Sequence, residues 1–497
     1  MVFKQILKKS HGLIGGLLLL ALFGCKRSES GKGTEEAFPD SSFVSVLEKL
    51  TDPVPVDLDP IRERGRLIAL TRYNANSYFI YRGQPMGFEY ELLTRLAEHL
   101  GVRLEIRVPA TWDSLFILLY RGEGDIIAAN LTVTKERAKK VAFTDHLITT
   151  RQVLVQRKPE GWRKMKLHEI EKQLIRSPID LIGRRVHVRR NSAYFTRLVH
   201  LSEELGGDIE IVAMPEDLET EDLIRMVARG EIDYTVADEN IALINQAYYA
   251  DIDVQMPLGV PQRIAWAVRP NAPQLLQAIN GWLRQIKSAS DPTFNLIYNK
   301  YYKNRRAFRA RMRSEFFSKT GGKISPYDDL IRQYADSLGW DWRLLASQMY
   351  QESQFDPQAR SWAGAVGLMQ VLPRTARQYG ITRLSDPRQN LEAAVRQLEW
   401  LWQYWQEIQE PEERIKFVLA SYNAGHGHIR DAQRLAQKYG RDPLRWDGNV
   451  EYFILQKSKE KYFTDPVVQF GYCRGEEPVN YVREILERYE HYKRFIQ

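Results

Sequence analysis

The sequence predicts a multidomain chain in which a bilobal α/β domain precedes a mainly α-helical domain. Near the start of the first domain, Arg66–Leu70 and Leu104–Val108 are predicted strands, and Glu91–His99 is a predicted helix with apolar residues at helical spacing. Gly101 is the expected C-cap of that helix. This strand–helix–strand order is typical of layered α/β folds.

An internal repeat indicates the second lobe. Arg121–Asn130 (RGEGDIIAAN) aligns with Arg229–Asp238 (RGEIDYTVAD), 108 residues further on, with five identities in ten positions. Each copy follows an amphipathic helix, begins near a glycine that ends the helix, and continues as a short apolar strand. The alternative is chance, because α/β units share this general order.

The N-terminus predicts export and a lipid anchor. Three lysines precede the uncharged, mostly apolar stretch Gly12–Gly24, whose about 13 residues fit a signal peptide and are too few to span a bilayer as a helix. The ending at Cys25 resembles a bacterial lipobox, which implies removal of residues 1–24, lipidation of Cys25 and, because Lys26 follows it, the outer membrane. An ordinary signal peptide or a short buried helix is the alternative. Residues 25–59 are predicted to be a flexible tether.

Composition limits the partners. The net charge is +8 and the pI is about 9.1, which in an exported protein favours anionic membrane surfaces or cell-wall polymers over nucleic acid. Cys473 is the only cysteine besides Cys25, so no intramolecular disulfide is expected if Cys25 is lipidated. His426 and His428 have no cluster of cysteines or acids near them, so we expect no metal site, and no cofactor is expected either.

Residues 60–305 resemble a family of periplasmic solute-binding proteins that capture amino acids between two lobes. The resemblance is carried by Gly87–Leu93 (GFEYELL), Leu131–Arg137 (LTVTKER) and Val141–Asp145 (VAFTD). It implies a first lobe of about residues 60–155 and 261–305, and a second lobe of about residues 156–260.

The same resemblance implies a ligand site. Arg137 takes the place of the arginine that pairs with the ligand α-carboxylate, a contact that suits a planar guanidinium. Thr132 would add donors, Asp238 would hold the ligand ammonium, and Ser192 lies in the corresponding turn of the second lobe, where Asn191 replaces the usual glycine. The alternatives are a surface arginine at the start of a helix for Arg137 and a helix cap for Asp238.

Residues 306–324 are predicted to link the two domains. The basic run from Lys303 to Arg313 favours a solvated linker or helix face, and binding of an anionic lipid or polymer is the alternative.

Residues 325–497 form the predicted helical domain. Ser325 and Pro326 are the expected start of one helix and Gly339 its end, and Asp341 is the expected cap of the next. On that second helix, Leu345, Met349 and Glu352 share one face. Glu352 therefore extends an apolar stripe, where partial desolvation raises the pKa of a carboxyl group and suits it to act as a general acid. The alternative is a solvated glutamate at a fraying helix end.

Four blocks in this domain resemble the catalytic domain of lytic transglycosylases, which has a lysozyme-like, mainly helical fold. They are Glu352-Ser353, Gly367–Gln370 (GLMQ), Ala420–Gly425 (ASYNAG) and Pro478–Val482 (PVNYV). The whole chain resembles the membrane-bound murein transglycosylase F group, which joins such a domain to a solute-binding-like module.

This resemblance implies cleavage of peptidoglycan glycan strands by one carboxyl group, whereas most glycosidases use two. Glu352 would first donate a proton to the leaving oxygen and then accept one from the C6 hydroxyl of N-acetylmuramic acid, which closes a 1,6-anhydro ring. The residues implied in orienting Glu352 or binding the glycan are Ser353, Met369, Gln370, Tyr422, Asn423 and Tyr481. The bilobal domain would sense an amino acid or muropeptide and regulate cleavage. The alternatives are a hydrolase that uses water and a non-enzymatic receptor whose C-terminal domain grips murein.

Overall fold

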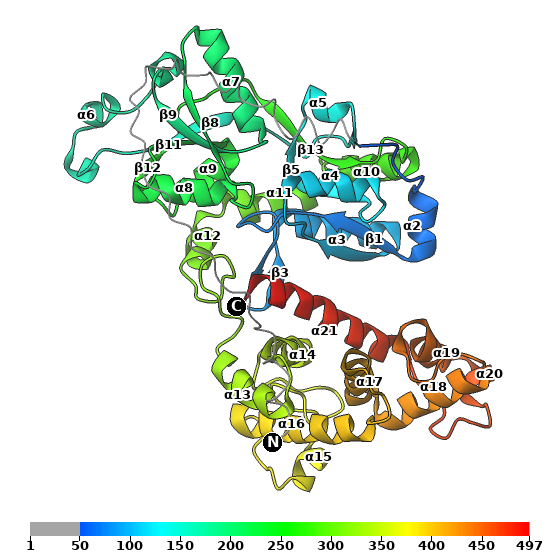
Figure 1. The fold of residues 1–497 in the computed structure, drawn as a ribbon. Coiled ribbons are helices and arrows are strands. Elements are labelled where there is room, and N and C mark those ends of the chain that lie inside the picture. Colours follow the sequence, from blue (N-terminus) through cyan, green and yellow to red (C-terminus); the bar gives the residue numbers. More distant parts are fainter. Residues whose placement is uncertain (1–49, 497) are drawn as a thin grey trace, which may run out of the picture. The chain divides into compact units, whose positions relative to one another are not determined.

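The computed structural model describes residues 50–496, so the predicted signal peptide and Cys25 lie outside the described part of the chain. A bilobal α/β module and an all-helical domain follow one another along the chain (Figure 1). Within residues 50–496, no helix is both long and apolar enough to cross a membrane.

The first lobe is built on one mixed sheet with helices on both faces. The strand order is β4 (Arg103–Arg107), β1 (Arg66–Leu70), β5 (Ile126–Thr132), β13 (Gln262–Val268) and β6 (Ala142–Phe143), with β7 (Ile148–Thr150) also paired to β13. Along β5, Ile126 and Ala128 join the core of helix α3 (Phe88–Leu100), whereas Ile127 and Ala129 join the core of helix α4 (Trp112–Tyr120). This alternation explains why the first four residues of β5, 126–129, are all apolar.

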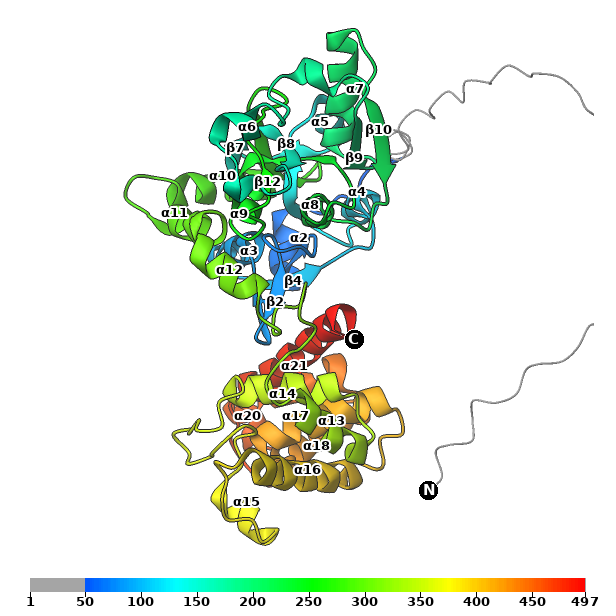
Figure 2. The ribbon, with the colours of Figure 1, turned by 90° about the vertical axis from the view of Figure 1, so that its left-hand side faces the viewer.

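The second lobe repeats the arrangement. Its strand order is β10 (Glu210–Met214), β9 (Arg185–Arg189), β11 (Tyr234–Asp238), β8 (Gln152–Arg157) and β12 (Ile252–Asp253). Its main helices are α7 (Ala193–Leu205), α8 (Thr220–Arg229) and α9 (Glu239–Gln246), which are visible around the sheet in Figure 2. Strands β5 and β11 hold the third place in their sheets, so the sequence repeat corresponds to a structural repeat. The chain leaves lobe 1 before β8 and returns with β13, which gives two crossovers.

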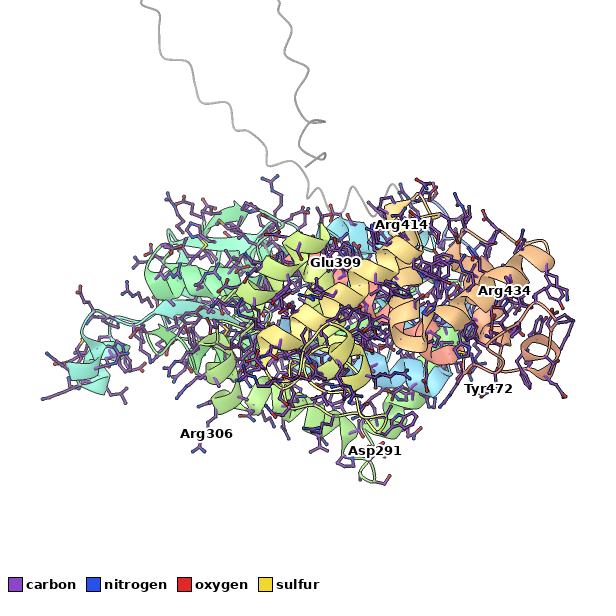
Figure 3. All side chains as sticks on the ribbon, turned by 90° about the horizontal axis from the view of Figure 1, so that it is seen from below. Asp291, Arg306, Glu399, Arg414, Arg434 and Tyr472 are labelled. Carbon is purple, nitrogen blue, oxygen red and sulfur yellow. The ribbon has the colours of Figure 1, made fainter. Side chains whose placement is uncertain are left out.

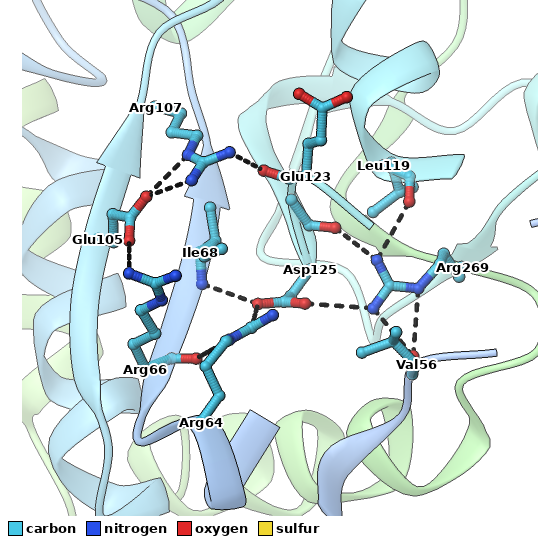
Figure 4. A network of polar contacts seen from close by, with 11 residues as sticks. Val56, Arg64, Arg66, Ile68, Glu105, Arg107, Leu119, Glu123, Asp125 and Arg269 are labelled. Carbon is cyan, nitrogen blue, oxygen red and sulfur yellow. Dashed lines mark hydrogen bonds and ion pairs between the residues drawn. The ribbon is translucent and has the colours of Figure 1, made fainter. Parts of the chain in front are cut away.

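A buried ion network anchors lobe 1 (Figure 4). Asp125, within the first copy of the repeat, accepts hydrogen bonds from the backbone nitrogen of Ile68 at 2.8 Å and from Arg269 Nη2 at 3.2 Å, and it also pairs with Arg64. The side chains of Asp125 and Arg269 are fully buried. The network joins β1, the first strand of the lobe, to Arg269, which directly follows β13, the strand with which the chain returns to this lobe.

Both ends of the module differ from the sequence prediction. Helix α2 (Leu58–Arg64) begins inside the predicted tether, capped by Asp57, and the backbone nitrogen of Val54 already bonds to the carbonyl of Tyr120. The predicted linker begins as helix α12 (Arg305–Met312), after α10 (Pro273–Ile286), α11 (Thr293–Tyr298) and a π-turn at Asn299–Lys303. Arg306 points into solvent (Figure 3), but Arg311 is buried, with its guanidinium 4.6 Å from the ring centroid of Phe79.

The helical domain surrounds one apolar core. Its helices are α13 (Asp328–Leu338), α14 (Trp342–Ser353), α15 (Pro373–Gln378), α16 (Pro387–Tyr404), α17 (Pro411–Ala424), α18 (His426–Lys438), α19 (Glu451–Gln456), α20 (Glu460–Phe463) and α21 (Glu476–Phe495). Gly339 and Asp341 act as predicted. The predicted start at Ser325 is wrong, because the carboxylate of Asp328 accepts hydrogen bonds from both the backbone nitrogen and the hydroxyl of Ser325, and the helix begins at Asp328.

A hairpin of lobe 1 contacts helix α21 of the helical domain. Strands β2 (Phe79–Tyr81) and β3 (Gln84–Met86) are joined by a two-residue turn whose residues, Arg82 and Gly83, both have positive φ, as in a type I′ turn. The carbonyl of Gly83 accepts a hydrogen bond from the hydroxyl of Tyr492 on α21 at 2.7 Å.

Candidate active site

Helix α14 carries Glu352 in its last turn. Leu345 and Met349, on the same face, are fully buried in the core, which confirms the predicted stripe. Asp341 caps the start of the helix by accepting a hydrogen bond from the backbone nitrogen of Arg343. The helix therefore holds Glu352 at the border of the core rather than in open solvent.

The carboxyl group of Glu352 has an acid–base character suited to proton donation. Burial raises its pKa to about 7, and a hydrogen bond from the hydroxyl of Tyr481 partly offsets this increase. Gln348 Nε2 in turn donates to the Tyr481 oxygen at 3.1 Å, which fixes the tyrosine from one turn before Glu352. Among the residues of the described chain, no second carboxylate contributes to this pKa. Glu352 is therefore half protonated near neutral pH.

Hydrogen bonds hold the Gly367–Gln370 segment next to the end of helix α14. Ser353 Oγ donates to the carbonyl of Leu368 at 2.7 Å, and the Tyr422 hydroxyl donates to the carbonyl of Met369 at 2.9 Å. Burial is the main cause, and the charge of Glu352 a further cause, of the raised pKa of Tyr422, so this tyrosine also faces the carboxyl group. The structure thus gathers Ser353, Met369, Tyr422 and Tyr481 around Glu352.

Two other predicted site residues, within the described part of the chain, form no hydrogen bond with Glu352. Gln370 has a left-handed backbone, and its Nε2 donates to the carbonyls of Gly367 and Ala359, so the side chain stabilises its own loop. Asn423 is exposed, and within residues 50–496 no hydrogen bond joins its side chain to the group around Glu352.

Sequence reasoning missed Asn390 and Gln348. Asn390 is fully buried on α16: its Oδ1 accepts from the backbone nitrogen of Met369 at 2.8 Å, and its Nδ2 donates to the carbonyls of Val366 and Leu384. A polar residue on the apolar face of a predicted helix is the signal that could have identified it, since buried amides need partners.

The predicted ligand residues lie between the two lobes. Arg137 is buried and donates from Nη1 to the carbonyl of Thr132 at 2.9 Å, and both residues line a cavity of about 30 Å³. Ser192 lines it too, but its hydroxyl donates to the carbonyl of Arg189 and caps α7. Asp238 accepts a hydrogen bond at 2.9 Å from Nδ2 of Asn130, and Asn130 lines the cavity. Asn130 and Asp238 are the last residues of the two aligned copies of the sequence repeat.

Comparison with known protein families gives two matches. Residues 67–304 match the bacterial extracellular solute-binding proteins, family 3, and residues 329–444 match the transglycosylase SLT domain. A membrane-bound lytic murein transglycosylase F from Desulfosudis oleivorans is 40% identical over 430 residues, covering 86% of this chain and 90% of the relative. The protein of the same name from Ectopseudomonas mendocina is 32% identical over 443 residues, covering 88% and 86%.

Solved structures resemble the N-terminal half. A mutant of ArgBP from T. maritima aligns with a TM-score of 0.42 and 26% identity, covering 50% of this chain and 99% of that protein. An ancestral amino acid-binding protein, AncCDT-1, aligns with a TM-score of 0.41 and 29% identity, covering 49% and 98%.

Proposed function

We propose that this chain, which belongs to the membrane-bound lytic murein transglycosylase F family, cleaves the β-1,4 bond between N-acetylmuramic acid and N-acetylglucosamine without water and leaves 1,6-anhydro ends. The observation that carries the proposal is the buried carboxyl group of Glu352, whose pKa of about 7 lets it give and then take a proton at neutral pH, with no second carboxylate of residues 50–496 contributing to that pKa. Most hydrolytic glycosidases use a second carboxyl group, either as a nucleophile or to activate a water molecule.

The reaction follows from this arrangement. Protonated Glu352 donates its proton to the glycosidic oxygen as the bond to C1 of N-acetylmuramic acid breaks. The resulting carboxylate, stabilised by the hydroxyl of Tyr481, removes the proton from the C6 hydroxyl of the same sugar. The C6 oxygen then bonds to C1, and Glu352 is protonated again. The attack is intramolecular, so proximity replaces the ordered water that a hydrolase must hold.

Digestion of purified murein tests the proposal. Mass spectrometry of the products should show anhydro ends, one water lighter than reducing ends, and Glu352→Gln should abolish them. Reducing ends would instead identify a hydrolase. Products that persist in Glu352→Gln would exclude Glu352 as the catalytic acid, and binding of murein without products from the unmodified protein would mean that the C-terminal domain only grips murein.

The module of residues 60–305 is proposed to bind an amino acid or muropeptide between its lobes, with Arg137 and Thr132 receiving the carboxylate and with Asp238 and Ser192 contributing from lobe 2. Buried Arg137, fixed by the carbonyl of Thr132, supports this role. Ligand binding would then alter cleavage by Glu352. A variant lacking residues 60–305 whose activity equalled that of the intact chain, with and without such ligands, would exclude the coupling.

The proposed location is the periplasmic face of the outer membrane, through lipidation at Cys25. The apolar stretch before Cys25 supports it. Cys25→Ala should move the protein from the outer-membrane fraction into the soluble periplasmic fraction and abolish incorporation of labelled palmitate. Retention of the label would exclude this anchor.

A further inference from the structure

The cleft between the lobes contains an unusual number of buried cations. Arg72 of lobe 1, Arg137 of lobe 1 and Arg189 of lobe 2 are 4%, 6% and 7% exposed. Arg137 and Arg189 line the same cavity, and the charge of Arg189 contributes, after burial, to lowering the pKa of Arg137. The guanidinium groups therefore act on one small volume, and a ligand there meets a positive field.

One carboxylate serves two of these cations. Glu219, at the N-cap of α8, lies with Oε1 2.7 Å from Arg72 Nη2 and with Oε2 3.7 Å from Arg189 Nη1. Within the described chain, Arg189 Nη1 is buried without any hydrogen bond. Burying a guanidinium nitrogen without an acceptor costs free energy. An anion within hydrogen-bonding distance of Arg189 Nη1 would offset this cost, and the carboxylate of Glu219 is too far away to form that bond.

The neighbouring acids do not fill this need. Burial raises the pKa of Glu221 to about 7 and that of Asp238 to about 6, so the cleft disfavours a negative charge on both side chains. Glu221 accepts a hydrogen bond from Asn76 Nδ2 at 3.0 Å, and Asp238 accepts one from Asn130. Their carboxyl groups are already used in joining the lobes.

The aromatic surface of the cleft is also occupied. The guanidinium carbon of Arg189 lies 4.1 Å from the ring centroid of Trp112, and that of Arg72 lies 5.4 Å from it. These cation–π contacts use the surface on which a cationic ligand side chain would stack. A ligand with a basic side chain would meet like charges instead.

We infer that the cleft selects an acidic α-amino acid, whose α-carboxylate binds Arg137 and whose side-chain carboxylate binds Arg189. This rests on the ligand-binding role proposed above for the module. The cavity of about 30 Å³ has no room for such a ligand while Glu219 holds its place, so the ligand enters as the lobes part. Its side-chain carboxylate then replaces that of Glu219 between Arg72 and Arg189. Arg189 is thereby the residue that determines specificity.

Calorimetric titration of the full-length protein in detergent, with L-glutamate, D-glutamate, L-glutamine and L-arginine as probes, tests the inference. One glutamate enantiomer should bind at least about tenfold more tightly than glutamine, and arginine should bind most weakly. The side-chain carboxylate of glutamate accepts a charge-assisted hydrogen bond from Arg189, the amide of glutamine accepts a weaker one, and the guanidinium of arginine repels it. Arg189→Gln should remove the preference for glutamate over glutamine. Arg190→Gln is the matched control, since this adjacent arginine is exposed, and it should retain the preference.

The outcomes separate this inference from the ligand-binding role. The selectivity is overturned if glutamine or arginine binds as tightly as glutamate, or if Arg189→Gln keeps the preference for glutamate. In either case the proposed role of the module in binding amino acids still stands. Absence of binding by all four probes overturns both. Should Arg189→Gln fail to fold by circular dichroism, the order of affinities in the unmodified protein decides alone.

Discussion

Replacing Tyr481 with phenylalanine should move the pH dependence of cleavage to higher pH. Glu352 must be protonated to start the reaction, so kcat/KM should fall as the pH rises through its pKa of about 7. The Tyr481 hydroxyl donates to the carboxylate and so stabilises the charged form, which holds this pKa below the value that burial alone would set. Tyr481→Phe removes that effect, and the pKa rises.

The size of the change follows from the hydrogen bond. A bond to a charged group contributes about 1.5–3 kcal/mol, and each pKa unit corresponds to about 1.4 kcal/mol, so the alkaline limb should move up by about one to two units. The rate at pH 5 should also fall, because Gln348 loses its acceptor and the proton-accepting carboxylate loses a stabilising donor.

Initial rates of anhydro-product release from murein between about pH 5 and pH 9, at constant ionic strength, measure the limb directly. Tyr489→Phe is the matched control, because this tyrosine lies on the same helix and also donates to a carboxylate, that of Asp341 at 3.2 Å. An alkaline limb that stays in place or moves to lower pH in Tyr481→Phe would refute the assignment of Glu352 as the titrating acid.

Three further predictions concern the stability of the fold and the Gly367–Gln370 segment. Glu352→Gln should stabilise the helical domain by roughly 3 kcal/mol at pH 8 and by about 1 kcal/mol at pH 5, because a carboxyl group with a raised folded-state pKa costs stability as the pH rises from 4.5 through about 7. Thermal unfolding at both pH values measures this difference. Gly83→Ala should cost about 2–5 kcal/mol, because its Cβ would lie 2.5 Å from the ring of Phe355, whereas Gly65→Ala, with similar φ and open space, should cost about 1–2 kcal/mol by the same assay. Asn390→Ala should lower kcat at least about tenfold by releasing the Met369 backbone, and unchanged turnover of murein would show that this loop needs no such support.

Local signals in the sequence predicted much of the fold and the position of Glu352 beside the core, whereas its catalytic role was inferred from the resemblance to lytic transglycosylases. The position of Glu352 beside the core follows from its helical spacing from Leu345 and Met349. The two lobes follow from the sequence repeat, whose copies form the third strand of each sheet. The specificity proposed for the cleft could not be found this way. Glu219 of lobe 2 pairs with Arg72 of lobe 1 and lies near Arg189, and no periodicity within these separate segments of the sequence indicates those contacts.

The hairpin contact supplies a physical step for the proposed coupling between the modules. Gln354 and Phe355, directly after helix α14, both have left-handed backbones, with φ of 52° and 66°, although neither is glycine. Such residues cost about 1–3 kcal/mol each and persist only where their surroundings hold them. Gly83 of lobe 1 packs against the ring of Phe355 and is itself held by Tyr492. A movement of lobe 1 that withdrew Gly83 would remove this support, and the relaxed turn would reorient Glu352 because only Ser353 separates it from the strained pair.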